Sequence, residues 1–407
     1  MYLVDGRRYE PNEHELERAL AAAYDDRIRP LCLCCDPAIP VYIARSGGTF
    51  VLKRMPFTGS QHAVGCPHYE PPAELSGLGE VLGTAISEDP DTGVTQLRVG
   101  FAMSKGTPRP VELGSDQGNG SVRSDGTRLS LRGLLHFLWL EADLTKWRPG
   151  FAGKRTWAVV RNHLLAAASN KVLKGTPLAD ALYIPEAFTV AAAEEIRTRR
   201  DRQFDHRLKQ EGRGQSKMIL IGEVKEIVPA RSHFNLVIKH VPDMPLFLNS
   251  ELHRRMTRKF EAELAMWTGS AETHLIMAAT FALADWGQPV IDELCLVPTS
   301  AQWLPVDDGF EMQLIDRLVS QHRVFDKSLG FNSQLPACSV SAVLLDVLRA
   351  PVALELDRTY DRLLDSDAIA RPAAAAWRWK VHATEIPTLP RYDDGFAAAI
   401  AHSRHSH

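Results

Sequence analysis

Most cysteines of this chain fall in one short window near its N-terminus. Four of the six cysteines lie there, followed or flanked by two histidines: Cys32, Cys34, Cys35, Cys66, His62 and His68. Thiolates and imidazoles are the usual ligands of structural zinc, which takes four of them in a tetrahedron. A Cys-x-Cys pair, an expected β-hairpin and a His-x3-Cys pair therefore predict a zinc site made of Cys32, Cys34, His62 and Cys66.

Several alternatives stay open for this cluster. Cys35 could replace Cys34, and His68 could replace His62, because the sequence alone does not separate neighbouring ligands. The cysteines could also be buried thiols that behave as small hydrophobic residues. Their clustering favours zinc, and a zinc ion ligated only by protein is structural and contributes to folding.

Composition limits the classes of partner. The chain has 407 residues, which favours two or three domains, and a formal net charge of -3, so nucleic acid could contact only local basic patches. The first residues do not have the pattern of a signal peptide, and no uncharged apolar stretch approaches the ~18 residues of a membrane span. We expect a cytoplasmic protein without a membrane partner.

Hydrophobic periodicity predicts an α+β, multidomain chain. Its expected parts, in order, are a zinc-knuckle module (1–85) with a helix at 13–24 and a β-hairpin, a strand and flexible loop (86–128), a helical module (129–190), a charged linker helix (191–217), an α+β unit of two strands, one helix and two strands (218–300), a nuclease-like unit (301–392) and a tail (393–407).

The helical module carries cations and tryptophans together. Two helices, at about 129–141 and 156–168, resemble a helix-turn-helix or winged-helix arrangement. Trp147 and Trp157 could stack on bases, and the candidate phosphate contacts here and in the linker helix are Lys146, Arg148, Lys154, Arg155, Arg161, Arg199 and Arg200. The alternative is a helical hairpin whose tryptophans fill a core and whose cations are solvated.

Several segments resemble a known bacterial family. The runs PLCLC, VYIAR, LKRMPFTG, HAVGC and YEPPAELSGLG, with the later GLLHFLW, KWRPGFAGKRTW, IGEVKEI and WLPVDDGFE, are similar to the family catalogued as domain of unknown function 1173. That family is met mostly on plasmids and integrative conjugative elements. The resemblance implies a cysteine knuckle and a mobile-element context, and no established activity. DNA and other mobile-element or conjugation proteins are the expected partners.

The last third resembles a restriction-endonuclease-like domain. A helix carrying Glu311 precedes strands at 324–331, 340–347 and 351–357 and a further helix from about 360. Glu311, Asp346 and Glu355 are the candidate catalytic residues, and they would hold Mg²⁺ if the domain were a nuclease.

Two departures argue against such an activity. Ala337 and Cys338 stand where the metal-binding Asp would be, and Glu355-Leu356-Asp357 replaces Glu-x-Lys. We therefore expect a degenerate, non-cleaving domain. The preferred function is a zinc-containing, DNA-binding, non-catalytic accessory protein of a mobile element; the alternatives are a divalent-metal nuclease and a protein-interaction scaffold.

Overall fold

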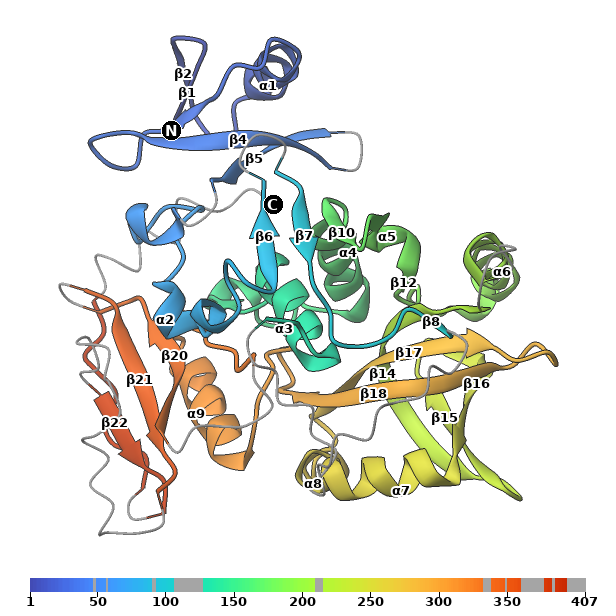
Figure 1. Cartoon of the computed structure of the whole chain (residues 1–407). Helices are drawn as coiled ribbons and strands as arrows, with labels where there is room; N and C mark the ends of the chain where they lie inside the picture. Colours follow the sequence, from blue (N-terminus) through green and yellow to red (C-terminus); the bar gives the residue numbers. More distant parts are fainter. Residues whose placement is uncertain are drawn as a thin grey trace.

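The fold is a mixed α+β arrangement of several sheets and helices, seen in a computed structural model (Figure 1). The structure describes residues 1–46, 49–55, 58–89, 93–105, 127–208, 215–331, 338–347, 350–359, 377–382 and 385–393. Among these residues, none of the helices combines the length and the apolar character that crossing a bilayer requires.

The N-terminal segment forms a five-stranded sheet in the order β2-β1-β3-β4-β5. One helix, α1, covers it through Leu16, Leu20 and Ala23, whose helical spacing puts them on one buried face. The predicted helix and hairpin are present here. The elements are β1 (Tyr2–Val4), β2 (Arg7–Tyr9), α1 (His14–Asp25), β3 (Leu31–Cys32), β4 (Ile39–Ser46) and β5 (Thr49–Arg54), followed by the short helices η1 (Gly59–Gln61), α2 (Ala73–Ser76) and η2 (Leu78–Glu80).

The middle of the chain is built around two helices. The first, α3, is buried over nearly its whole circumference, so it is an interior helix. The expected loop at 114–126 lies outside the described residues. The elements are β6 (Ile86–Glu88), β7 (Thr95–Leu97), β8 (Ser104–Lys105), α3 (Leu131–Glu141), β9 (Lys146–Trp147), η3 (Pro149–Phe151), α4 (Trp157–Ala168), β10 (Lys171–Leu173), β11 (Thr176–Pro177), α5 (Leu178–Ala181), β12 (Leu182–Tyr183), η4 (Val190–Ala192), α6 (Ala193–Leu208) and β13 (Gln215–Ser216).

The next unit closes its sheet on itself. Its five long strands pair in the ring β14-β15-β16-β18-β17, and β17 pairs back with β14. All neighbours in the ring are antiparallel except β16 and β18, which run parallel. The elements are β14 (Met218–Pro229), β15 (His233–Ile238), β16 (Val241–Asn249), α7 (Ser250–Lys259), α8 (Glu261–Gly269), β17 (His274–Leu283) and β18 (Pro289–Thr299).

This unit corrects the expected element order. Three strands, not two, precede the helical segment, because the stretch from 233 to 249 folds back on itself as β15 and β16. The single helix expected over 250–267 is two helices, because the backbone of Phe260 leaves the helical conformation, with φ -113° and ψ 32°; its side chain is buried.

The C-terminal unit is a five-stranded sheet in the order β22-β21-β20-β19-β9, with α9 on one face. Strand β22 runs parallel to β21, and β9 comes from the middle of the chain. The strand expected over 324–331 is only three residues long, and the helix expected from about 360 lies outside the described residues. The elements are α9 (Gly309–Ser320), β19 (Phe325–Lys327), β20 (Cys338–Leu344), β21 (Val352–Asp357) and β22 (Trp377–Lys380).

The N-terminal and C-terminal units share a core. Val324, Val343 and Ala353 of the C-terminal unit belong to one hydrophobic cluster with Tyr69 and Leu75 of the N-terminal unit. Two regions at opposite ends of the sequence therefore stabilise one another by burying apolar surface.

At one position of this junction only glycine fits. Gly77 has φ +81°, and a Cβ built on it would lie 1.9 Å from the carbonyl oxygen of Leu329. The Leu329 backbone N–H donates to Ser76 at 3.2 Å, which holds the two backbones together.

We expect Gly77→Ala to lower the free energy of unfolding by about 3 kcal/mol, because it adds left-handed strain and a backbone clash. Chemical denaturation measures the change. Gly83→Ala is the matched control, since Gly83 has a similar φ of +76° and no atom within 4 Å of its Cβ position. Equal losses in the two variants would show that the contact with Leu329 contributes nothing.

Candidate metal centre

Two backbone segments bring the cysteines and His62 together. Cys32 is the last residue of β3 and pairs with Tyr2 on one side and Ile39 on the other. His62 follows η1 directly, and a turn in which the Cys66 N–H donates to Ala63 at 2.7 Å returns Cys66 to the same place. The sheet therefore positions the first pair of ligands and the turn positions the second pair.

Four side-chain atoms converge between these segments. The sulfurs of Cys32, Cys34 and Cys66 and a ring nitrogen of His62 all lie within 4.8 Å of one another. The Cys32 and Cys66 sulfurs are 3.6 Å apart, and the His62 Nδ1 lies 3.3 Å from the Cys34 sulfur and 3.7 Å from that of Cys66. This group could hold a metal ion.

The pKa values of the three thiols also fit the binding of a cation. The hydrogen bond between Cys32 and Cys66 lowers the pKa of the Cys66 thiol to about 3 and raises that of Cys32. Burial raises the pKa of the Cys34 thiol to about 11. Without a metal, the protein environment therefore favours ionisation of one of the three thiols. A bound cation would stabilise the other two as thiolates, which are the ligands of a soft-metal site.

The neighbouring candidates make other contacts. The Cys35 sulfur lies 3.8 Å from that of Cys34 and 3.5 Å from the Gln61 carbonyl oxygen. The Nε2 of His68 is 3.0 Å from the Tyr2 hydroxyl, and burial lowers the pKa of His68 to about 4. Cys35 and His68 therefore adjoin the group without belonging to it.

Only the family comparison finds relatives. Residues 2–382 match the family described as "Protein of unknown function (DUF1173)". The chain belongs to this family. No curated protein and no solved structure matches it.

The three candidate catalytic carboxylates lie in separate ion pairs. Glu311 binds Lys327 at 2.9 Å, Asp346 binds Arg323 at 2.8 Å, and Glu355 binds Arg378 at 2.8 Å. Among the described residues, the cysteine and histidine group is the one set of at least three acidic, cysteine or histidine side chains close enough to share an ion. The carboxylates are not brought together.

Strand geometry explains this separation. Leu354 and Leu356 of β21 pack with Leu314 of α9, so Glu355 between them points to the opposite face of the sheet from α9. Glu311 projects from α9 itself and is buried, with the Asp307 N–H donating to it at 2.7 Å.

Most of the predicted phosphate contacts have partners within the protein. Lys146 pairs with Asp143 at 2.6 Å, Arg199 with Glu186 at 2.9 Å and Arg200 with Asp243 at 2.9 Å. Arg148 is buried, while Lys154 is exposed.

The remaining two arginines support the backbone around the tryptophans. Arg155 donates to the Leu144 carbonyl at 3.0 Å, and Arg161 to that of Ile184 at 2.9 Å. Trp147 and Trp157 are almost fully buried, which agrees with the core alternative for these rings.

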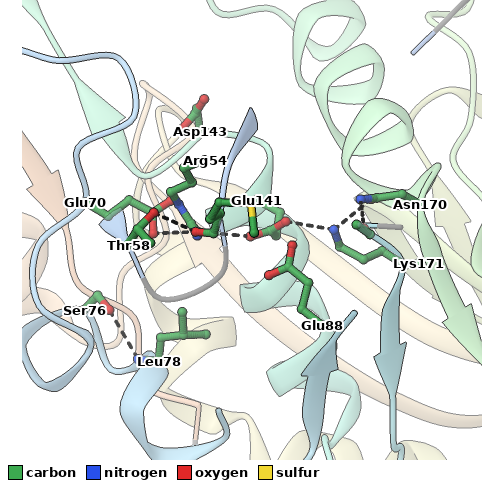
Figure 2. Close-up of polar contacts among 12 residues, drawn as sticks. Arg54, Thr58, Glu70, Ser76, Leu78, Glu88, Glu141, Asp143, Asn170 and Lys171 are labelled. Atoms are coloured by element: carbon green, nitrogen blue, oxygen red, sulfur yellow. Dashed lines mark hydrogen bonds and ion pairs between the residues drawn. The ribbon is translucent and has the colours of Figure 1, made fainter. Parts of the chain in front are cut away.

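The structure contains a polar cavity that the sequence did not predict. It has a volume of about 400 Å³ and lies between the segment after η1 and the end of α3 (Figure 2). Arg54 lies 2.7 Å from Glu70 and 3.6 Å from Glu141, and Lys171 lies 2.8 Å from Glu141. Burial raises the pKa of the Glu141 carboxyl, but Lys171 and Arg54 outweigh it and hold the value at about 2.

These charges come from segments far apart in the sequence, so no local pattern marks them. A second missed feature does have a local signal: the Asp285-Trp286-Gly287 turn carries an indole ring that is 69% exposed.

We expect the purified protein to contain about one metal ion per chain by elemental analysis, and Cys66→Ser to lose it because the variant lacks a buried thiolate ligand. Cys35→Ser is the matched control and should retain the metal. Loss of metal from Cys35→Ser together with retention in Cys34→Ser would show that Cys35, and not Cys34, is the metal ligand.

Proposed function

We propose that this protein is a non-catalytic, nucleic-acid-binding accessory protein of a bacterial mobile element, stabilised by a structural zinc ion. Zinc would occupy the group of Cys32, Cys34, His62 and Cys66. The context of a plasmid or integrative conjugative element, and other conjugation proteins as partners, come from the family resemblance.

The donor geometry supports zinc as the ion. Tetrahedral zinc with bonds of about 2.3 Å to sulfur and 2.0 Å to nitrogen puts neighbouring ligand atoms roughly 3.5–3.8 Å apart. Three of the six separations in the structure, 3.6 Å, 3.3 Å and 3.7 Å, are close to this range, and all four atoms lie within 4.8 Å of one another. Four protein ligands leave no open position for substrate, so the ion would stabilise the N-terminal module and perform no chemistry.

The nucleic-acid proposal rests on the closed five-stranded ring. Numbered along the chain, its strands pair in the order 1-2-3-5-4-1, with strands 3 and 5 parallel and a helical segment between strands 3 and 4. This is the connectivity of OB-fold barrels, whose face on strands 2 and 3 binds oligonucleotides or oligosaccharides. Fold alone does not assign a ligand, so the side chains on that face decide the matter.

The C-terminal unit supports a non-catalytic role. Its helix and three antiparallel strands follow the first four elements of the nuclease-like order expected from the sequence, the helix expected from about 360 lies outside the described residues, and the parallel strand β22 was not predicted. A nuclease would need its carboxylates free to hold divalent metal, whereas Glu311, Asp346 and Glu355 each neutralise a separate cation. We propose that this unit is a degenerate, docking version of the fold.

We expect the zinc-loaded protein to bind a fluorescent oligonucleotide, with an affinity that falls between about 50 and 200 mM salt by about twentyfold for a single strand, or about fortyfold for a duplex, if roughly three phosphates are contacted. Fluorescence anisotropy measures the affinity. Undetectable binding to both single-stranded and duplex DNA at low salt, with metal retained, would refute the nucleic-acid proposal.

We expect no cleavage of labelled DNA in the presence of Mg²⁺ or Mn²⁺, because each carboxylate is already paired. Gel analysis of the products checks this. Cleavage that disappears in Glu355→Ala but persists in Glu385→Ala, an exposed glutamate outside the sheet, would instead support the nuclease alternative.

A further inference from the structure

Three aromatic rings lie side by side on the outside of the barrel. The Phe247 ring is at the centre, with the His233 ring stacked on it at a centroid distance of 4.4 Å and an interplanar angle of 22°. The Trp286 indole meets Phe247 edge-on at 6.4 Å and 71°. We call His233, Phe247 and Trp286 the ring platform.

Strand pairing turns these rings outward. In β15 and β16, Leu236, Leu246 and Leu248 are fully buried in the barrel, so the alternate residues face the other way. Phe247 pairs with Asn235, which places it two residues along β15 from His233 on the same face.

The turn between β17 and β18 brings the indole to this face. Gln288 anchors the turn to β16, because its side-chain amide donates to the Pro245 carbonyl at 3.3 Å. The Trp286 Nε1–H donates to the Gln288 side-chain oxygen at 3.4 Å. The indole is therefore positioned by hydrogen bonds although its ring is largely in solvent.

Trp286 is the most exposed aromatic side chain among the described residues. It is 69% exposed, whereas Phe281 of the same barrel and Phe204 of α6 lie in the core. Val228 is 39% exposed and pairs with Asn235, which in turn pairs with Phe247. These three residues form a row across three strands at the face that OB-fold barrels use for ligands, with Asn235 and Phe247 half-buried and the exposed Trp286 ring against Phe247.

Cations flank the platform. Arg231 is exposed in the turn between β14 and β15, next to Ser232. The Ser250 hydroxyl donates to the Ser232 carbonyl at 3.1 Å, so α7 starts beside this turn, and its Arg254 and Arg255 are exposed. Glu251 contacts Arg254 and, at 3.9 Å, Arg255, so α7 presents two arginines for one glutamate here, while the exposed Asp285 is the acidic neighbour of Trp286.

We propose that the ring platform binds single-stranded nucleic acid, with bases stacked on Trp286, Phe247 and His233 and phosphates near Arg231 and α7. This inference rests on the proposed function and assigns its site. An exposed indole beside two half-buried rings, with cations nearby, suits a strand whose bases are unpaired, because a duplex hides its base faces inside the stack.

The test measures the affinity of the full-length protein for a 15-residue oligodeoxythymidine and for a duplex of the same length, by fluorescence anisotropy at about 50 mM salt. We expect the single strand to bind more tightly than the duplex. Trp286→Ala should weaken single-strand binding by about tenfold, since one stacked base contributes roughly that factor, and Trp286→Phe should restore most of the affinity.

Two further variants locate the effect. Tyr24→Ala removes another exposed ring, 46% exposed on α1, and is the control that should bind like the wild type. Lys154→Gln removes the exposed cation before α4 that the sequence predicted as a phosphate contact, and it tests the helical module as the rival site. Thermal melts verify that each variant is folded. Tighter binding to duplex than to single strand, or binding lost in Lys154→Gln and unchanged in Trp286→Ala, would overturn the ring platform while nucleic-acid binding stood. Failure of the wild type to bind either DNA would overturn both.

Discussion

The convergence of four soft ligand atoms between β3 and the turn after η1 is the constraint on which the N-terminal module depends. Cys32, His62 and Cys66 are almost fully buried, and three thiols that close favour a single thiolate unless a cation is present. The group ties the start of the chain to the segment that continues through Tyr69 and Leu75 into the core shared with the C-terminal sheet. Its effect therefore extends beyond the module.

Charge pairing is the second organising feature. Glu311, Asp346 and Glu355 are buried next to a lysine or an arginine, and Glu141 at the polar cavity is likewise paired with Arg54 and Lys171. A buried carboxylate is costly unless it is paired. Each of these carboxylates therefore has a protein cation beside it, and the separate pairs hold Glu311, Asp346 and Glu355 apart.

Trp286 differs from most of the described tryptophans. Rings such as Trp147 and Trp157 fill cores, while Trp286 stands in solvent beside Phe247. An indole exposed in the turn between β17 and β18 presents a surface for a ligand with flat, apolar faces. Bases of an unpaired strand have that property.

The sequence by itself determined the local features. It predicted the cysteine and histidine cluster, the helices at α1, α3, α4 and α9, and most strands of the barrel, because ligand spacing and hydrophobic period are properties of neighbouring residues. Tertiary structure alone decided that Cys34 and His62, not Cys35 and His68, complete the group, which cation each carboxylate pairs with, and that β14 and β17 close a ring. These outcomes depend on contacts between segments tens to hundreds of residues apart. In a sheet, for example, a shift of the pairing register by a single residue exchanges the inward and outward side chains of a strand.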